Sequence, residues 1–108
     1  MANENRQVLL KKQLTFKFDA NRKAQTQKQE QQISFSRGLD SVVAVVGGFD
    51  VRYPAPERED FGRLYVRANA VLADRGDEDV TVSCEFELSP NIDGYPGMGE
   101  VYVTVLGV

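Results

Sequence analysis

Histidine and tryptophan are absent from this chain of 108 residues, and cysteine occurs only once. Histidine is the commonest general base and the commonest metal ligand in proteins, so its absence removes both roles together. A single cysteine excludes an intramolecular disulfide and a paired-cysteine zinc site. The sequence also lacks a phosphate-binding lysine loop, a dinucleotide-type glycine motif and a nucleophile elbow. We therefore expect a protein that is not an enzyme and that has no metal site and no cofactor.

Long apolar runs are missing as well. The longest nearly apolar segment spans residues 42–49, which is far too short to cross a bilayer. The polar start of the chain leads into three apolar residues before Lys11 and Lys12, a pattern unlike a signal peptide. We expect the protein to be synthesised in the cytoplasm without a signal peptide. We expect no insertion into a membrane. The final location stays open, with a virion or an extracellular particle among the alternatives.

Charge is distributed unevenly, although the net charge is only −3. Residues 1–37 carry eight Lys and Arg against three Asp and Glu, whereas the rest of the chain carries five arginines, no lysine and thirteen acids. Such polarity fits a basic segment that docks on an acidic neighbouring subunit, a nucleic-acid-binding arm, or two solvated faces. The basic segment interleaves its cations with glutamine rather than with stacking aromatics, and the acidic body repels phosphate. We therefore expect no nucleic-acid partner.

What the chain does contain is alternation of apolar and polar residues with a period of two, which is typical of β-strands with one buried face. The alternating segments are residues 14–19, 33–36, 64–72, 80–88 and 101–106. A turn in which Gly76 supplies a positive φ predicts a hairpin between residues 64–72 and 80–88. Cys84 falls in phase with the apolar face of the second hairpin strand, which indicates a small core residue.

Two segments depart from this alternation. Residues 42–46 form a continuous apolar run, typical of a strand covered on both faces, and Gly47 and Gly48 then allow a bulge. Residues 20–32 are rich in Gln and Lys and fit a polar loop, a short exposed helix or an arm equally well. The sequence therefore predicts an all-β fold, a β-sandwich or barrel of one domain. Of the two, we expect a single antiparallel β-sandwich of about six to seven strands with a polar, basic N-terminal arm. Residues 1–32 form the N-terminal strand and arm, and residues 33–108 form the body of one domain.

Two sets of residues are candidates for function. Asn91, Asp93 and Tyr95 combine short polar side chains with an aromatic ring, as sugar binding requires. The last strand is apolar on both sides, so its outer face is expected to meet another layer or subunit. The residues predicted for an oligomer interface are Lys11, Lys12, Lys17, Tyr102, Thr104 and Leu106.

A family resemblance adds to these observations. ISFSRGLDSVVAVVGGFDVRY, LYVRANAVLAD, VTVSCEFEL and EVYVTVLGV resemble the strand sequences of the H-type lectin family over about residues 33–106. The resemblance implies a six-stranded antiparallel β-sandwich that assembles as a trimer or hexamer and binds N-acetylgalactosamine-type sugars between subunits. At the place of the family's basic residue on its fourth strand this chain has Tyr65, with Arg63 and Arg67 on the same face. Glu87 and Leu88 stand where the family has an aromatic residue and a histidine.

The functional expectation is therefore a non-enzymatic, oligomeric, lectin-like module that recognises cell-surface glycans through several weak sites. The candidate carbohydrate-binding residues are Arg63, Tyr65, Arg67, Asn91, Asp93 and Tyr95. The alternative is a structural subunit of a phage tail or virion, a contractile injection device or a similar assembly. The expected partners are other copies of the chain, glycans, and other subunits of a larger particle.

Overall fold

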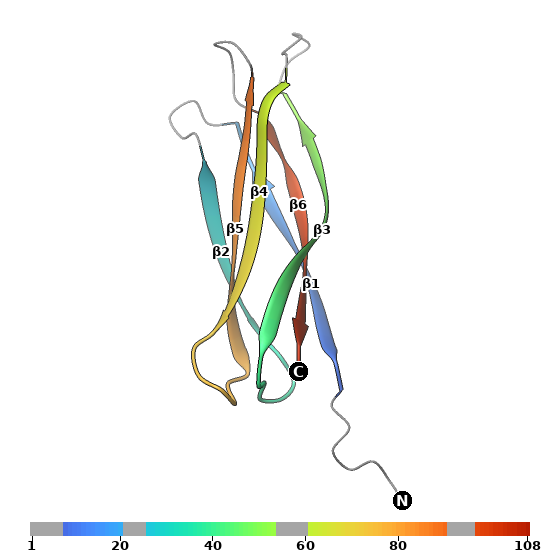
Figure 1. Cartoon of the computed structure of the whole chain (residues 1–108), viewed down its shortest axis with the longest axis vertical. Coiled ribbons are helices and arrows are strands. Elements are labelled where there is room, and N and C mark those ends of the chain that lie inside the picture. Colours follow the sequence, from blue (N-terminus) through green and yellow to red (C-terminus); the bar gives the residue numbers. More distant parts are fainter. Residues whose placement is uncertain (1–7, 21–25, 54–60, 91–96) are drawn as a thin grey trace, which may run out of the picture.

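A computed structural model of the chain describes residues 8–20, 26–53, 61–90 and 97–108. These residues form an elongated molecule of 63 × 25 × 16 Å that consists of strands and connecting loops (Figure 1). The strands are β1 (Leu10–Phe18), β2 (Gln27–Ser34), β3 (Val42–Arg52), β4 (Phe61–Leu72), β5 (Asp79–Pro90) and β6 (Met98–Gly107). Among the described residues there is no helix long and apolar enough to span a membrane.

Two three-stranded antiparallel sheets pack face to face. Sheet A has the order β1-β6-β3 and sheet B has the order β2-β5-β4, so β5 and β6 are the central strands and the other four are edge strands. The predicted all-β sandwich is confirmed, and so is the predicted hairpin, now β4 and β5. The basic N-terminal part of the chain supplies one edge strand to each sheet, β1 to sheet A and β2 to sheet B.

The core lies between the central strands. Every second residue of β5 and β6 is fully or almost fully buried, and Phe16 and Phe18 of β1 join them. The rings of Phe18 and Phe86 stack with their centroids 5.0 Å apart and their planes at 19°. Cys84 belongs to this core, as predicted. Burial, helped by the charge of Glu85, raises the pKa of its thiol to about 11, so the sulfur is protonated and unreactive at neutral pH.

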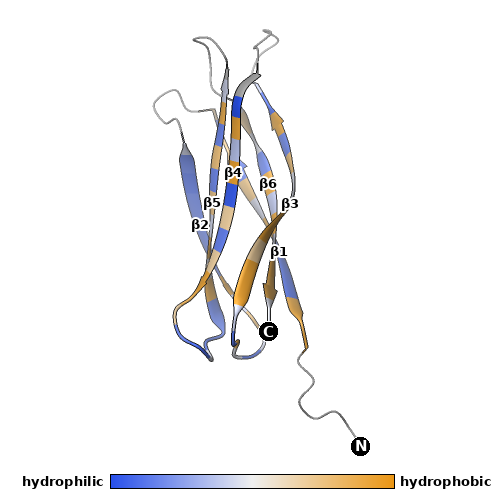
Figure 2. Cartoon of the chain, viewed as in Figure 1, coloured by the Kyte–Doolittle hydropathy of each residue, from blue (hydrophilic) through white to orange (hydrophobic). Residues whose placement is uncertain are grey.

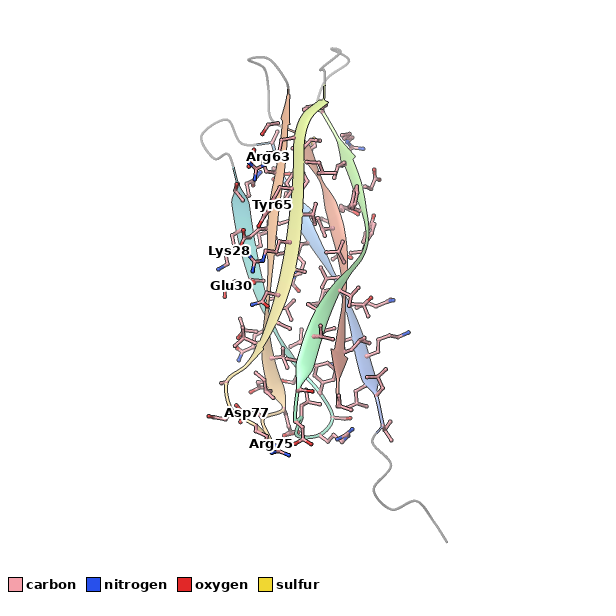
Figure 3. The ribbon with its side chains drawn as sticks, in the orientation of Figure 1. Lys28, Glu30, Arg63, Tyr65, Arg75 and Asp77 are labelled. Carbon is pink, nitrogen blue, oxygen red and sulfur yellow. The ribbon has the colours of Figure 1, made fainter. Side chains whose placement is uncertain are left out.

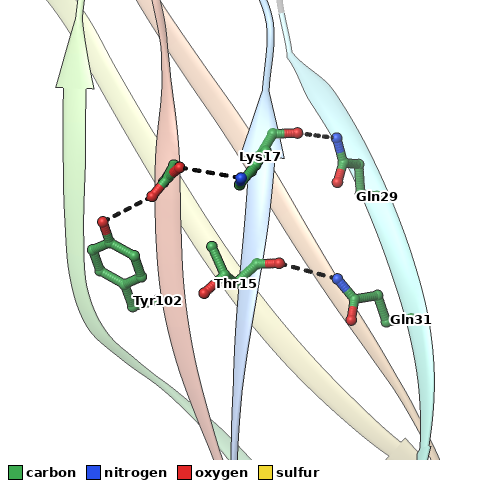
Figure 4. Close-up of polar contacts among 6 residues, drawn as sticks. Thr15, Lys17, Gln29, Gln31 and Tyr102 are labelled. Carbon is green, nitrogen blue, oxygen red and sulfur yellow. Dashed lines mark hydrogen bonds and ion pairs between the residues drawn. The ribbon is translucent and has the colours of Figure 1, made fainter.

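Strand β2 overturns the expectation of a polar loop, a short exposed helix or an arm for residues 20–32, because residues 27–32 belong to a strand of the sandwich. It carries glutamine at three inward positions, with exposed Lys or Glu between them, and Figure 2 shows it as the most continuously hydrophilic strand. Each of these glutamines donates its side-chain Nε2–H to a backbone carbonyl of β1 or of the residue that follows it. The three bonds run from Gln27 to Asp19 (2.7 Å), from Gln29 to Lys17 (2.5 Å) and from Gln31 to Thr15 (3.1 Å). This glutamine seam joins the two sheets along one side, and Figure 4 shows the bonds of Gln29 and Gln31.

One end of the sandwich is closed by the β4–β5 turn and the segment between β2 and β3. Leu39 is fully buried there; its N–H donates to the carbonyl of Asp77 (2.9 Å) and its carbonyl accepts from Gly76 (2.7 Å). Gly76 has a φ of 98°, which confirms the predicted positive φ. A Cβ on Gly38 would lie 2.3 Å from the Gly76 carbonyl oxygen, so no side chain fits at that position. Arg75 projects outward beside this contact, with its Nε 3.0 Å from Asp40 (Figure 3).

Strand β3 departs from the prediction for residues 42–46. The register shifts between Val46 and Gly48, so the predicted bulge is confirmed. The expected cover on both faces is wrong for the single chain, because Val43 and Val45 are 52% and 46% exposed. β3 is an edge strand of sheet A, and no described element of the chain lies over the outer face of that sheet.

The core predicts the effect of two phenylalanine truncations. Phe86→Ala removes a fully buried ring and is expected to lower the free energy of unfolding by about 3–5 kcal/mol. Phe49→Ala truncates a half-exposed ring on β3 and is expected to cost less than about 1.5 kcal/mol. Urea unfolding of the two variants measures the difference, and equal losses would contradict the assignment of the core.

Candidate functional site

The outer face of sheet A carries an apolar strip, in which Val43, Val45 and Tyr102 are exposed and Leu106 is half-buried. Val43 pairs across the sheet with Leu106, and Val45 pairs with Thr104, so β3 and β6 present these side chains on adjoining rows. Figure 2 shows the hydrophobic colouring along this part of β3. Contiguous apolar side chains on an otherwise polar surface mark interaction sites.

A hollow of about 230 Å³ adjoins the apolar strip, between β1 and the β3 bulge. Its outward-facing lining consists of Gln13, Thr15, Gly47, Tyr102 and Thr104. A Cβ on Gly48 would lie 3.6 Å from the Tyr102 ring. The bulge therefore leaves this side of the ring without a covering side chain.

A charged network lies beyond Tyr102. The tyrosine hydroxyl donates to Oε2 of Glu100 (3.0 Å), and the other carboxylate oxygen lies 3.7 Å from Nζ of Lys17 (Figure 4). The hydrogen bond to Glu100 raises the pKa of Tyr102, because it favours the protonated phenol.

A second cavity, of about 250 Å³, lies at the upper end of the same face, which is the end where β1 and β3 finish and β6 begins (upper end in Figure 1). Charged side chains of both signs line it: Lys17, Asp19, Asp50, Arg52 and Glu100. The outer face of sheet A therefore combines an apolar half with a charged half.

The predicted interface residues can now be placed. Lys11 pairs with Leu106 across the sheet, and Lys17, Tyr102 and Thr104 share the same outer face. Lys12 lies apart from them, because it pairs with the inward-facing Val105 and its ammonium sits 5.8 Å from the Phe35 ring centroid. Val43 and Val45 were not among the predicted interface residues. The apolar run that contains them, followed by two glycines, is the sequence feature that could have indicated them.

The outer face of sheet B holds the predicted sugar-binding residues of β4. Arg63, Tyr65 and Arg67 lie opposite Ser89, Glu87 and Glu85 of β5. The guanidinium of Arg63 lies 5.3 Å from the Tyr65 ring centroid, as a cation–π contact requires. Figure 3 shows the two side chains together on β4. The other predicted residues, Asn91, Asp93 and Tyr95, lie outside the described residues.

Glu87 is the one buried charged residue among the described residues, with 8% of its surface exposed. Ser89 donates to its Oε2 (2.7 Å), Thr26 donates to its Oε1 (2.8 Å), and Nε of Arg63 lies 3.9 Å away. The Ser89 hydrogen bond is the main cause that lowers the pKa of Glu87; Thr26 and Arg63 add to it, while burial opposes it. Glu87 is therefore a fixed, ionised acceptor rather than a proton donor. Sequence reasoning missed this role, because Thr26 is 61 residues away.

The described residues contain no group of three or more His, Cys, Asp or Glu side chains that could hold a metal ion. Comparison with protein-family models, curated proteins and solved structures gave no match. The H-type lectin resemblance stays a prediction from sequence.

The environment of Glu87 predicts a dependence of stability on pH. Its unfolded carboxyl titrates near the ordinary 4.5 and the folded one below it, so the ionised form stabilises the fold above about pH 4.5. That contribution is lost as the pH falls through the folded pKa. Glu87→Gln should therefore be less stable than the wild type at neutral pH, and the gap should narrow at an acidic pH, where the Glu87 carboxyl becomes protonated in the folded protein.

Urea unfolding at the two pH values measures this gap. Ser89→Ala is the companion variant, because it removes the strongest cause of the low pKa and should move the loss of stability to higher pH. An equal gap between Glu87→Gln and wild type at both pH values would contradict the assignment.

Proposed function

We propose that this protein is a non-enzymatic module that associates with further copies of itself through the outer face of sheet A. The apolar strip is the observation that carries the proposal. Val43 and Val45 are each about half exposed, and covering the exposed half of such a side chain contributes about 1 kcal/mol. The glycine bulge adds a side-chain-free area beside Tyr102, where a partner surface can approach closely.

The protection of the strand edges supports association through the sheet face rather than through an edge. Sheet edges with free backbone groups recruit strands from other chains. On the β1 side, the carbonyls of Thr15, Lys17 and Asp19 already accept glutamine hydrogen bonds. On the opposite side, the two remaining edge strands, β3 and β4, lie against each other.

A self-associating β-sandwich of this kind suits a structural subunit of a phage tail or virion, a contractile injection device or a similar particle. The uneven charge of the chain supports this setting. The three lysines of β1 and the acidic residues of the later strands give each copy areas of opposite sign, which favours specific contacts between neighbouring subunits.

Two valines provide a matched test of the proposed association. Val43 on sheet A and Val71 on sheet B are both 52% exposed, and both are on edge strands. Val43→Glu is expected to shift the protein from an oligomer towards a monomer, because it places a charge in the apolar strip. Val71→Glu should leave the oligomer unchanged. Light scattering coupled to size-exclusion chromatography measures the mass, and a monomeric wild type would reject the proposal.

A lectin-like activity is the second candidate function, and the outer face of sheet B favours it. Tyr65 supplies an aromatic ring, Arg63 lies against that ring, and Glu87 is a fixed acceptor beside both. An aromatic ring beside oriented polar groups suits a pyranose, which has an apolar CH face and hydroxyl groups. Association through sheet A leaves this face free and multiplies its weak sites.

A glycan array tests this second function. Binding by the wild-type protein is expected to be lost in Tyr65→Ala and retained in Val71→Ala, which truncates an exposed side chain towards the other end of the same strand. Silence of the folded wild type across a broad array would reject the lectin-like activity and leave self-association untouched.

A further inference from the structure

The arrangement of charges on the outer face of sheet A points to one geometry for the second copy. We propose that two copies pack sheet A against sheet A about a two-fold axis parallel to the strands. In this arrangement β1 of each copy lies over β3 of the other, and β6 lies over β6. The inference rests on the proposed self-association and specifies its partner and its orientation.

Two charged rows lie at the upper end of the face. In the first row, Lys17 of β1 pairs with Glu100 of β6, and Glu100 pairs in turn with Asp50 of β3. One edge of this row is therefore positive and the other edge is negative.

The second row has the opposite order. Met98 of β6 pairs with Arg52 of β3, and Asp19 follows β1 on the other side. The carbonyl of Asp19 accepts a bond from β2, as the carbonyls of Thr15 and Lys17 do. The strand alternation therefore continues to Asp19, which lines the same cavity as Lys17.

These opposite orders distinguish the two face-to-face dimers in which the strands of the two copies are aligned. With the axis parallel to the strands, each Lys17 faces Asp50 of the other copy, and each Asp19 faces Arg52 of the other copy. Both pairs occur twice because a two-fold interface is self-complementary. Glu100 of β6 faces its own counterpart, but each Glu100 carboxylate has the Lys17 ammonium 3.7 Å away, and the four opposite-charge pairs outweigh this single like-charge contact.

With the axis across the strands, β1 of one copy lies over β1 of the other copy. The upper end of one β1 then faces the lower end of the other. Lys17 then approaches Lys11 of the other copy, and like charges across an interface disfavour a complex. The charge pattern therefore selects the axis parallel to the strands.

The apolar strip fits the selected geometry. Tyr102 and Leu106 are on the central strand, so each lies close to the axis and to its own counterpart. Val43 and Val45 of β3 lie over the lower half of β1, where Lys11 and Gln13 present the aliphatic parts of their side chains. A two-fold contact of this kind requires an even number of copies, as in a dimer or in a hexamer built from two trimers.

Charge reversal tests the pairing of Lys17 with Asp50. Lys17→Glu alone and Asp50→Lys alone should each weaken self-association about tenfold or more, because each places two like-charged pairs in the interface. An equimolar mixture of the two variants should restore association as a heterodimer. In that heterodimer the two substituted side chains face each other with opposite charges, and the unmodified Lys17 faces the unmodified Asp50. Analytical ultracentrifugation measures the dissociation constants.

Lys28→Glu provides the matched control. It has the same net charge as Lys17→Glu, but it alters the outer face of sheet B, where Lys28 pairs with Glu85. It should associate like the wild type, and mixing it with Asp50→Lys should form no more heterodimer than mixing wild type with Asp50→Lys. Circular dichroism checks that every variant is folded.

The outcomes separate this inference from the proposed function. An oligomeric wild type whose association is unaffected by either charge reversal, or is not restored by mixing, would overturn the two-fold geometry and leave self-association through sheet A intact. An assembly with an odd number of copies would also overturn the geometry. A monomeric wild type would overturn both.

Discussion

The width of the sheets is the constraint on which the rest of this structure depends. A sheet of three strands has one central strand and two edges, so only β5 and β6 are flanked by neighbours on both sides. Their inward residues, such as Val82 and Val103, are almost completely shielded from water, whereas inward residues of β3 and β4, such as Val46 and Leu64, are only partly buried. Among the edge strands, β1 contributes fully buried rings. Much of the hydrophobic stabilisation is therefore concentrated on β1, β5 and β6, and the other edge strands tolerate small or polar residues at inward positions.

The glutamine seam is a consequence of that constraint. β1 and β2 come from different sheets, and neither has a second main-chain neighbour. Glutamine is long enough to reach from one strand to the other, and its amide donates to carbonyls that otherwise remain unpaired. The seam also determines where positive charges of the N-terminal segment lie in the fold. Because the glutamines join β1 to β2, Lys17 lies on the outer face of sheet A and Lys28 on the outer face of sheet B, and each has a glutamate carboxylate within 4.0 Å.

Sequence alternation was sufficient to predict the sandwich, the β4–β5 hairpin, the bulge and the inward position of Cys84, because these depend on local period and turn chemistry. It was insufficient for β2, whose inward residues are glutamines, since an apolar period cannot reveal a strand that is held by polar bonds to another strand. The apolar run of β3 was interpreted as covered on both faces, because sequence does not show that the strand is an edge. The environment of Glu87 was invisible for a related reason: its partners are brought together by the cross-strand register.

The outer faces of the two sheets differ in their side chains. The outer face of sheet A has apolar side chains and a glycine bulge, features that favour close contact with a flat protein surface. On the outer face of sheet B, the Glu87 carboxylate accepts hydrogen bonds from two hydroxyls and lies beside an arginine. Because these polar groups already have partners within the chain, their burial against another protein would contribute little. This polar network keeps its orientation when sheet A is covered. Packing through sheet A therefore leaves two copies of the sheet B face directed away from each other, and weak binding at each face would be strengthened by multivalency without any rearrangement of the sandwich.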